Sequence, residues 1–232
     1  MKYERIERAT FLERPNRFIA YARIAGKQET IHVKNTGRCA ELLVPEAEIF
    51  VQESDNPERK TKWDLIGVRK GNRLINMDSR IPNKVVEEWL RAGNLFLEPV
   101  TVRPETTYGN SRFDFYVESG EKKAFIEVKG VTLEEDGVVR FPDAPSERAV
   151  KHMEELIRAK KEGYDAYVFL VIQMKGVRYF TPNMDTQPEF GEVLKKAKAA
   201  GVKILAYDCQ VTEDSIKIDE EVPVVLHFKK YE

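Results

Sequence analysis

The chain has 232 residues, enough for one large domain or two small ones that fold without disulfide or metal staples. It contains 38 Lys and Arg against 39 Asp and Glu, so any attraction to a polyanion depends on local clusters of positive charge and not on net charge. The two cysteines, Cys39 and Cys209, lie far apart without metal-ligand spacing, and we expect both to be buried free thiols.

The start of the chain gives no sign of export or membrane insertion. Residues 1–8 alternate in charge where a signal peptide would have an apolar run, and no stretch approaches the roughly 20 apolar residues of a membrane span. We therefore expect a cytoplasmic protein with no membrane partner. The oligomeric state stays open, a homodimer included.

Short apolar or alternating segments, separated by turn-forming residues, dominate the first third of the chain. The expected strands are residues 18–24, 30–33, 48–51, 62–68 and 73–76, with one helical turn at 40–44. About five short strands fit a small closed barrel, for which the oligonucleotide/oligosaccharide-binding (OB) barrel is the commonest five-stranded candidate. An SH3-like barrel is the alternative.

The pattern changes near Ile81 to one typical of an α/β domain. Pro82 and the apolar spacing after it predict a helix over 83–92, followed by an extended stretch over 96–103. Ser146 is a good N-cap for a helix over 146–161. A strand buried on both faces (166–173), a helix (188–200) and a further strand (202–207) complete the pattern. We expect an OB-like barrel over 1–80 and an α/β domain with a mixed central sheet over 81–232.

Two runs, 111–118 and 123–129, predict a hairpin whose two-residue turn is Gly120-Glu121. That turn fixes the register of the hairpin. The core face then pairs Phe115 with Ile126, Phe113 with Val128, and Val117 with Ala124. The opposite face pairs Asp114 with Glu127 and Arg112 with Lys129, and it places Lys129 diagonal to Asp114.

Two carboxylates opposite each other destabilise a sheet unless a cation compensates them. Mg²⁺ is typically held by one or two carboxylates and water, so Asp114 and Glu127 are candidate ligands of Mg²⁺ or Mn²⁺. Lys129 is placed to orient an activated water or to stabilise a phosphate. On spacing alone, a solvated sheet face with charges balanced by Arg112 and Lys129 is an equally good interpretation.

The helix over 146–161 has a buried stripe and a polar face. The stripe consists of Ala149, Val150, Met153, Leu156 and Ile157. The opposite face carries Arg148, Lys151, His152 and Glu155. The first three side chains can contact phosphate, and the alternative is a solvated charged face. Gln173, at the end of the buried strand, is a further candidate for the same site.

Basic residues of the N-terminal segment alternate with aromatic ones, as they do in barrels that bind single strands. They are Arg17, Arg23, His32, Lys34, Arg38, Arg59, Lys60 and Lys62, with Phe18, Tyr21 and Trp63 among them. Because most barrel aromatics pack in the core, we expect Phe18 and Trp63 to be packing residues. Arg38, in the glycine-bearing turn over 35–38, is the best single candidate for a nucleic-acid contact in this half.

Asp114, Glu127 and Lys129 follow the order D-x(12)-E-x-K, which resembles the PD-(D/E)xK nuclease signature. That signature usually adds an acidic residue from the first helix of the core. Glu87 and Glu88 are the candidates, and Glu88 lies at the edge of the apolar stripe. An ordinary surface glutamate is an equal alternative for either position.

Longer motifs are spread over nearly the whole chain. They are Asn35-Thr36-Gly37-Arg38, Glu41-Leu42-Leu43, Arg59-Lys60-Thr61, Pro82-Asn83, Ser111-Arg112-Phe113-Asp114-Phe115, Glu127-Val128-Lys129-Gly130-Val131-Thr132-Leu133, Phe141-Pro142-Asp143-Ala144, Glu147-Arg148 and Lys151-His152. These motifs, and their order, resemble the sugar fermentation stimulation protein A (SfsA) family. The resemblance implies an OB-type N-terminal domain, a PD-(D/E)xK-like C-terminal domain and DNA binding. Pro45-Glu46-Ala47 and Ala149 depart from the family pattern, but neither belongs to the Asp114, Glu127 and Lys129 set.

The sequence thus predicts a DNA-binding protein, single-stranded and branched DNA included, with a metal-dependent phosphodiesterase site. The expected catalytic residues are Asp114, Glu127, Lys129 and Glu88, and the expected nucleic-acid contacts are Arg38, Arg112, Arg148, Lys151 and His152. One alternative is a DNA-binding regulator of sugar metabolism genes that does not cleave. Another is a carbohydrate- or protein-binding barrel, which the Arg and Lys content near residues 35–62 disfavours.

Overall fold

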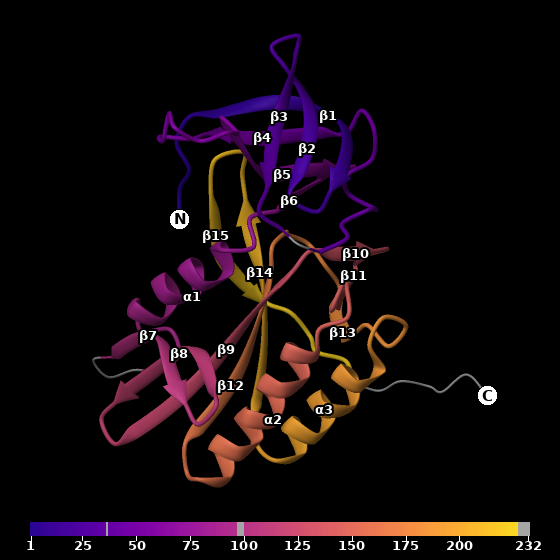
Figure 1. Cartoon of the computed structure of the whole chain (residues 1–232). Coiled ribbons are helices and arrows are strands. Elements are labelled where there is room, and N and C mark those ends of the chain that lie inside the picture. The colour runs from indigo at the N-terminus through magenta and orange to yellow at the C-terminus, as the bar shows by residue number, and fades with distance from the viewer. Residues whose placement is uncertain (36, 97–99, 227–232) are drawn as a thin grey trace, which may run out of the picture.

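A computed structural model describes residues 1–35, 37–96 and 100–226. Parts of the predicted turn over 35–38 and of the predicted extended stretch over 96–103 therefore lie outside the described residues. The chain folds into a β-barrel and a larger α/β domain that meet along one seam (Figure 1).

The barrel is closed by five strands. They are β1 (Ile6–Asn16), β2 (Ile19–Ile24), β3 (Lys27–Val33), β4 (Glu48–Glu53) and β5 (Trp63–Lys70). The order β3-β2-β1-β4-β5 closes because β3 also pairs with β5, and β6 (Arg73–Asn76) extends β5. The predicted barrel is confirmed. Strand β1 was missed because only Ala9 and Phe11 of its residues are buried. The predicted helical turn near residues 40–44 is present, since the Leu43 N–H donates to the Cys39 carbonyl at 3.0 Å.

The second domain is built on a six-stranded sheet in the order β15-β14-β12-β9-β8-β7. The sheet is mixed, as the sequence predicts, but its strand order was not predicted. Its strands are β7 (Thr101–Tyr108), β8 (Ser111–Ser119), β9 (Lys122–Val131), β12 (Asp165–Ile172), β14 (Lys203–Val211) and β15 (Ile216–Glu221). Strand β12 runs parallel to both β9 and β14, and the outer pairs are antiparallel.

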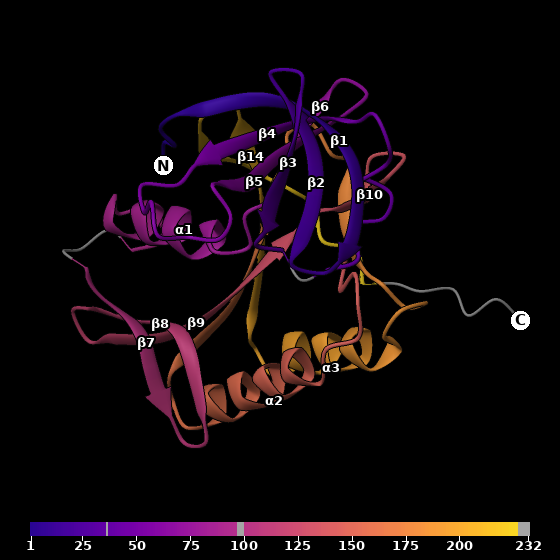
Figure 2. The same ribbon diagram turned by 45° about the horizontal axis from the view of Figure 1, so that its top comes forward.

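Helices cover both faces of this sheet. Helix α1 (Ile81–Arg91) lies on one face, and α2 (Glu147–Lys161) and α3 (Pro188–Ala199) lie on the other (Figure 2). Seven of the eight residues of β12 are buried, which explains the continuous apolar run in the sequence. The Ser146 hydroxyl accepts a hydrogen bond from the Ala149 N–H at 3.2 Å, so the predicted N-cap of α2 is confirmed.

A small three-stranded sheet joins the barrel to the α/β domain. It consists of β10 (Leu133–Glu135), β11 (Val138–Phe141) and β13 (Tyr179–Pro182). The buried carboxylate of Glu134 accepts from Lys70 at 2.9 Å and from Arg73 at 2.6 Å, both in the barrel. These strands are too short to give a periodic signal, and the sequence did not predict them.

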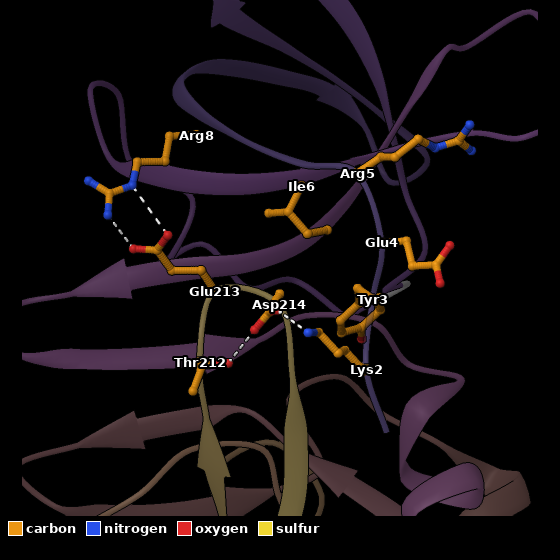
Figure 3. Close-up of a pocket in the computed structure, with 9 residues that line it drawn as sticks. All are labelled: Lys2, Tyr3, Glu4, Arg5, Ile6, Arg8, Thr212, Glu213 and Asp214. Carbon is orange, nitrogen blue, oxygen red and sulfur yellow. Dashed lines mark hydrogen bonds and ion pairs between the residues drawn. The ribbon is translucent and has the colours of Figure 1, made fainter.

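The first residues of the chain cross from the barrel to the C-terminal domain. The Tyr3 N–H donates to the Asp214 carbonyl at 2.7 Å, and the Tyr3 hydroxyl accepts from Asn76 at 2.8 Å. Figure 3 shows the pocket between this segment and the β14–β15 turn, across which Arg8 pairs with Glu213. The N-terminus therefore helps to fix the two domains to each other.

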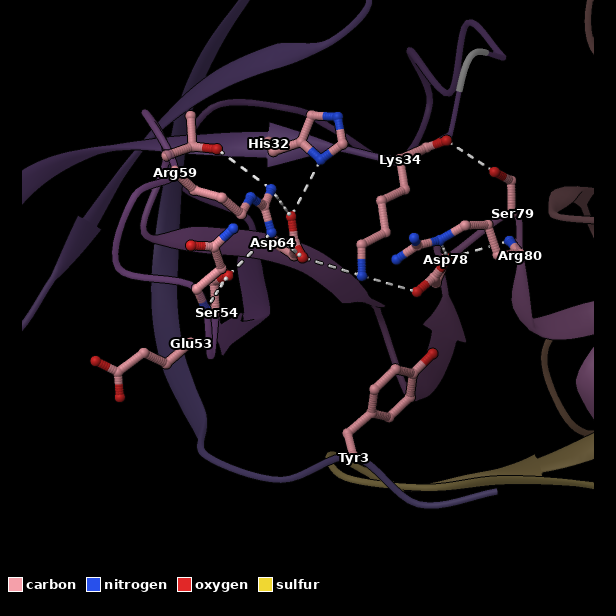
Figure 4. Close-up of polar contacts among 12 residues, drawn as sticks. Tyr3, His32, Lys34, Glu53, Ser54, Arg59, Asp64, Asp78, Ser79 and Arg80 are labelled. Atoms are coloured by element: carbon pink, nitrogen blue, oxygen red, sulfur yellow. Dashed lines mark hydrogen bonds and ion pairs between the residues drawn. The ribbon is translucent and has the colours of Figure 1, made fainter.

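A buried ionic cluster lies on the barrel side of the seam (Figure 4). The Asp64 carboxylate accepts from Arg59 at 2.8 and 2.9 Å, and it contacts Lys34 and His32 at 3.1 Å each. The Lys34 ammonium, whose side chain is 6% exposed, also binds Asp78 at 3.0 Å. Burial would raise the pKa of Asp64, but the hydrogen bonds from its three partners outweigh burial and hold that pKa well below its usual range.

We expect the Asp64→Asn variant to lose about 3 kcal/mol or more of unfolding free energy at pH 7, because it leaves Lys34 buried with one partner fewer. The pKa of Asp64 is lower in the folded state, so its contribution is complete above the unfolded pKa of about 3.9 and is lost as pH falls toward the folded value. Urea unfolding at several pH values should show the difference from wild type shrinking below about pH 4. Asp55→Asn, at an exposed ion pair, is the control and should cost under about 1 kcal/mol. An equal cost for the two variants would contradict a buried ionic cluster.

None of the helices in the three described ranges has both the length and the apolar character needed to cross a lipid bilayer.

Candidate active site

The β8–β9 hairpin has the predicted turn and register. Ser119 pairs with Lys122 across Gly120-Glu121, and Gly120 has a φ of 59°. The predicted pairs of Phe115 with Ile126 and of Val117 with Ala124 are both present. The turn chemistry therefore fixed the alignment of the two strands correctly.

The pairing ends earlier than the sequence predicts. Within the described residues the ladder stops at Phe115 and Ile126, and Asp114 Oδ2 instead accepts the Val128 N–H at 2.7 Å. Phe113 packs in the core that contains α2, whereas Val128 packs with α1, so the predicted pair of these two residues does not form. The strands separate at Asp114, which turns its carboxylate toward β9.

Glu127 is the most enclosed acid of this region, with 2% of its surface exposed. Its Oε1 atom accepts from both Lys129 Nζ and His152 Nδ1. Its Oε2 atom is buried and has no hydrogen-bond partner in the described part of the chain. Burial would raise the pKa of Glu127, but His152 and Lys129 outweigh burial and lower it, so the buried carboxylate stays ionised.

Asp114 lies beside this carboxylate and accepts two hydrogen bonds. One is the Val128 N–H, and the other is the side-chain amide of Asn83, at 2.8 Å from Oδ1. Burial and the negative charge of Glu127 raise the pKa of Asp114, against the opposing effects of Val128, Lys129 and Asn83. A bound cation would relieve the repulsion between the two acids.

Asn83 is a site residue that the sequence analysis did not single out. It lies in the first turn of α1, where the PD-(D/E)xK pattern led us to look for an acid. The predicted acids are elsewhere: Glu88 is exposed and binds the N-terminal ammonium at 2.9 Å, and Glu87 pairs with Arg91 at 2.7 Å. The structure thus contradicts the placement of Glu88 near Asp114. The phrase Pro82-Asn83 was the available signal for the correct residue.

His152 faces inward and not to solvent as predicted. It is 4% exposed, and its Nδ1 atom contacts Glu127. Its Nε2 atom lies 3.4 Å from Arg148 Nε, which can only donate, so the proton of a neutral ring belongs on Nδ1. The helical stripe was misassigned because a buried histidine with a polar partner has no apolar signal in the sequence.

The other predicted contacts lie around the site with different partners. Arg148 is exposed at the edge of the His152 ring, and Lys151 donates to the Asn110 carbonyl at 3.2 Å. Arg112 is exposed and pairs with Glu105 at 3.4 Å. It aligns with Thr107 of β7, and the predicted pairing with Lys129 is not found among the described residues.

The turn that carries Arg38 is held in place by the guanidinium of Arg14. That group donates to the carbonyls of Asn35, Gly37 and Arg38 at 2.8 to 3.0 Å. The Arg38 side chain is exposed, and it has no hydrogen bond or ion pair within the described ranges. Its turn is therefore fixed while its guanidinium is free to bind another group.

Several basic residues that we expected on a barrel groove form ion pairs within the barrel. His32, Lys34 and Arg59 all bind Asp64, so they are not a free phosphate-binding surface. Trp63 is buried, as predicted, at 7% exposure. Phe18 is 44% exposed, so its prediction as a core residue was wrong.

A second acidic cluster lies on β14 and β15, at Asp208, Asp219 and Glu220. The Lys175 ammonium binds all three carboxylates, at 2.6 to 3.1 Å. This lysine offsets part of the negative charge of the three carboxylates.

Two family models match consecutive parts of the chain. The model described as the SfsA N-terminal OB domain matches residues 12–77, and the sugar fermentation stimulation protein RE domain matches residues 80–215. The chain belongs to the SfsA family. Related proteins named sugar fermentation stimulation protein homolog occur in Clostridium beijerinckii (61% identity, covering 97% of this chain and all of that one) and Desulfitobacterium hafniense (60%, covering 97% and 99%).

A solved structure of an SfsA protein has the same fold. It is the Pyrococcus furiosus protein, described as a complex with Ca²⁺, with 28% sequence identity and a TM-score of 0.88. The match covers 97% of this chain and 98% of the other. The family's OB domain corresponds to the barrel, and its RE domain contains Asp114, Glu127 and Lys129.

Proposed function

We propose that this SfsA protein is a metal-dependent phosphodiesterase that acts on DNA. The observation that carries the proposal is the buried, ionised Glu127, whose Oε2 atom lacks a partner beside a second carboxylate of raised pKa. A buried acceptor without a donor is costly, and a divalent cation satisfies both it and the neighbouring acid. The Ca²⁺ in complex with the Pyrococcus relative supports divalent-cation binding by this fold.

Asp114 and Glu127 fit the role of ligands to Mg²⁺ or Mn²⁺. Such ions commonly take one or two protein carboxylates and complete their shell with water and substrate phosphate. When bound, the ion supplies an activated water and neutralises charge on the phosphate. Asn83 and the Val128 N–H orient Asp114, while His152 and Lys129 orient Glu127.

Lys129 adds a positive charge to a site whose candidate metal ligands are both negatively charged. Its side chain is 15% exposed, so the ammonium is enclosed but accessible from one side. While protonated it cannot bind a metal, and it can donate to a water or a phosphate oxygen. We assign it to the attacking water or to the charge that develops in the transition state.

DNA would reach this site through exposed arginines on both domains, Arg38 on the barrel and Arg148 on α2. Because the net charge is −1, binding must come from such local contacts and should weaken steeply with salt. The Arg38→Ala/Arg148→Ala double variant should bind more weakly at every salt concentration tested. The slope of log affinity against log salt should fall by about 2.

Fluorescence anisotropy with a labelled oligonucleotide over a salt series measures this effect. The control is Arg103→Ala, which removes an exposed arginine from β7 and should leave affinity and slope nearly unchanged. An unchanged affinity in the double variant would remove these arginines from the binding surface.

The proposal is tested by incubating the purified protein with single-stranded, duplex and branched DNA in Mg²⁺, Mn²⁺ or chelator. Cleavage of at least one substrate with either metal, and none with chelator, is the expected result. The absence of cleavage with every substrate would leave the second candidate, a DNA-binding regulator of sugar metabolism genes. The names of the relatives refer to stimulation of sugar fermentation, which agrees with the sugar-metabolism part of that candidate.

A further inference from the structure

A cavity of about 400 Å³ lies at the seam between the barrel and the α/β domain. Asn35 and Gly37 line it from the barrel, and Gly130 and Ser146 line it from the other domain. Gly130 directly follows Lys129 on β9, so the cavity adjoins the strand that carries the candidate active site. A β-carbon at Gly130 would lie 2.4 Å from Gln173 Oε1 and 2.8 Å from Pro82 Cγ, so a larger residue there would have to displace these side chains.

The side chain of Gln173 gives this cavity a hydrogen-bond acceptor. The residue is 1% exposed, and its Nε2 atom donates to the carbonyls of Asn76 and Asp78 at 3.1 and 3.2 Å. Nε2 also donates to Asn76 Oδ1 at 3.0 Å, so the amide hydrogens are used inside the protein and the oxygen is the part of the amide left to meet a group in the cavity, which Gln173 lines. An amide oxygen in this position suits a bound group with an N–H donor. Asp143 also lines the cavity, and its carboxylate, whose Oδ2 atom accepts from the Cys39 N–H at 2.9 Å, is a second acceptor there.

An exposed aromatic side chain lies next to the cavity. Phe18 and Val44 are the only exposed large hydrophobic residues among those described. Arg17 lines the cavity, and its guanidinium lies 4.7 Å from the centre of the Phe18 ring. An exposed aromatic beside an arginine is the combination that binds unpaired bases by stacking and their phosphates by charge.

We infer that the seam cavity and the Arg17–Phe18 pair bind an unpaired stretch of DNA. One nucleotide would occupy the cavity, with the amino group of its base donating to Gln173, and a neighbouring base would stack on Phe18. A volume of about 400 Å³ suits a single small ligand and is too small for a base pair held in its duplex. This inference rests on the proposed function and assigns its substrate class: single-stranded or branched DNA, and not continuous duplex.

The test compares the affinities of a labelled single-stranded 15-mer and of the same sequence as a duplex. Binding is measured by anisotropy in Ca²⁺ buffer, with a gel to verify that the DNA stays intact. The variants are Phe18→Ala, which removes the stacking ring, and Ala144→Trp, which fills the cavity. The controls are Val44→Ala and Ala199→Trp, at exposed positions outside the cavity.

Each test variant should lose about tenfold or more in single-strand affinity, the size expected for one base–aromatic contact, with little change for duplex. The controls should match wild type. Phe18 is exposed, so its variant stays informative even if Ala144→Trp fails to fold. Equal losses for duplex and single strand, or no loss with Phe18→Ala, would overturn the inference.

The outcomes separate this inference from the proposed function. Cleavage by the wild type with an unchanged single-strand affinity in Phe18→Ala would refute the nucleotide site alone. A Phe18-dependent single-strand affinity without any cleavage would support the nucleotide site and refute the phosphodiesterase.

Discussion

Replacing Glu127 with glutamine is expected to lower cleavage by about 10³-fold or more and to remove Mn²⁺ binding. The variant keeps the shape of the side chain but loses the charge that a buried cation requires, and metal catalysis contributes several kcal/mol to such reactions. Glutamine can still accept from His152, so the local hydrogen bonding is largely retained. Calorimetric titration with Mn²⁺ and single-turnover kinetics measure the two effects.

Two control variants make this result specific. Glu118→Gln lies on the same hairpin outside the site and should behave as wild type. Asp219→Asn alters the other acidic cluster and should leave the Mn²⁺ site intact. If Glu127→Gln bound Mn²⁺ as tightly as wild type and Asp219→Asn did not, the metal would belong to the cluster around Lys175.

Replacing Lys129 with alanine is expected to lower cleavage by about 10²-fold or more while sparing Mn²⁺ affinity and most DNA affinity. A charge contact made in the transition state affects turnover and not ground-state binding. His152 still donates to Glu127 in this variant, so the metal ligand keeps one of its two positioning contacts.

The same measurements apply to Lys129→Ala, with Lys123→Ala, an exposed lysine on the same strand, as the control. Undiminished cleavage in Lys129→Ala would remove the lysine from the mechanism. A loss of Mn²⁺ affinity equal to the loss of cleavage would give it a structural role in place of a catalytic one.

Local rules predicted the parts of this fold that depend on local chemistry. Gly120-Glu121 fixed the register of the β8–β9 hairpin, and Ser146 marked the start of α2. The apolar run of β12 identified the central strand of the sheet. In each case a few adjacent residues determine the structure, so sequence alone was sufficient.

Long-range contacts decided the features that the sequence did not predict. The buried His152 forms a hydrogen bond with Glu127, 25 residues away, and a periodicity argument has no means to detect such a pair. Glu88 binds the N-terminal ammonium, and Asn83 is the residue of α1 that contacts Asp114. The ladder of the hairpin ends early because the Asp114 carboxylate replaces a backbone acceptor for Val128. Tertiary hydrogen bonds therefore determine which residues lie next to Asp114 and Glu127.

The central claim is that Asp114 and Glu127 form a metal-dependent cleavage site for DNA. It is tested most directly by comparing wild type with the Asp114→Asn/Glu127→Gln double variant, purified in parallel, on a labelled oligonucleotide with a single-stranded branch. We expect the wild type to cleave it in Mn²⁺ and not in chelator, and the double variant to leave it intact in both. Equal cleavage by the two proteins, or none by the wild type with either Mg²⁺ or Mn²⁺, would contradict the claim.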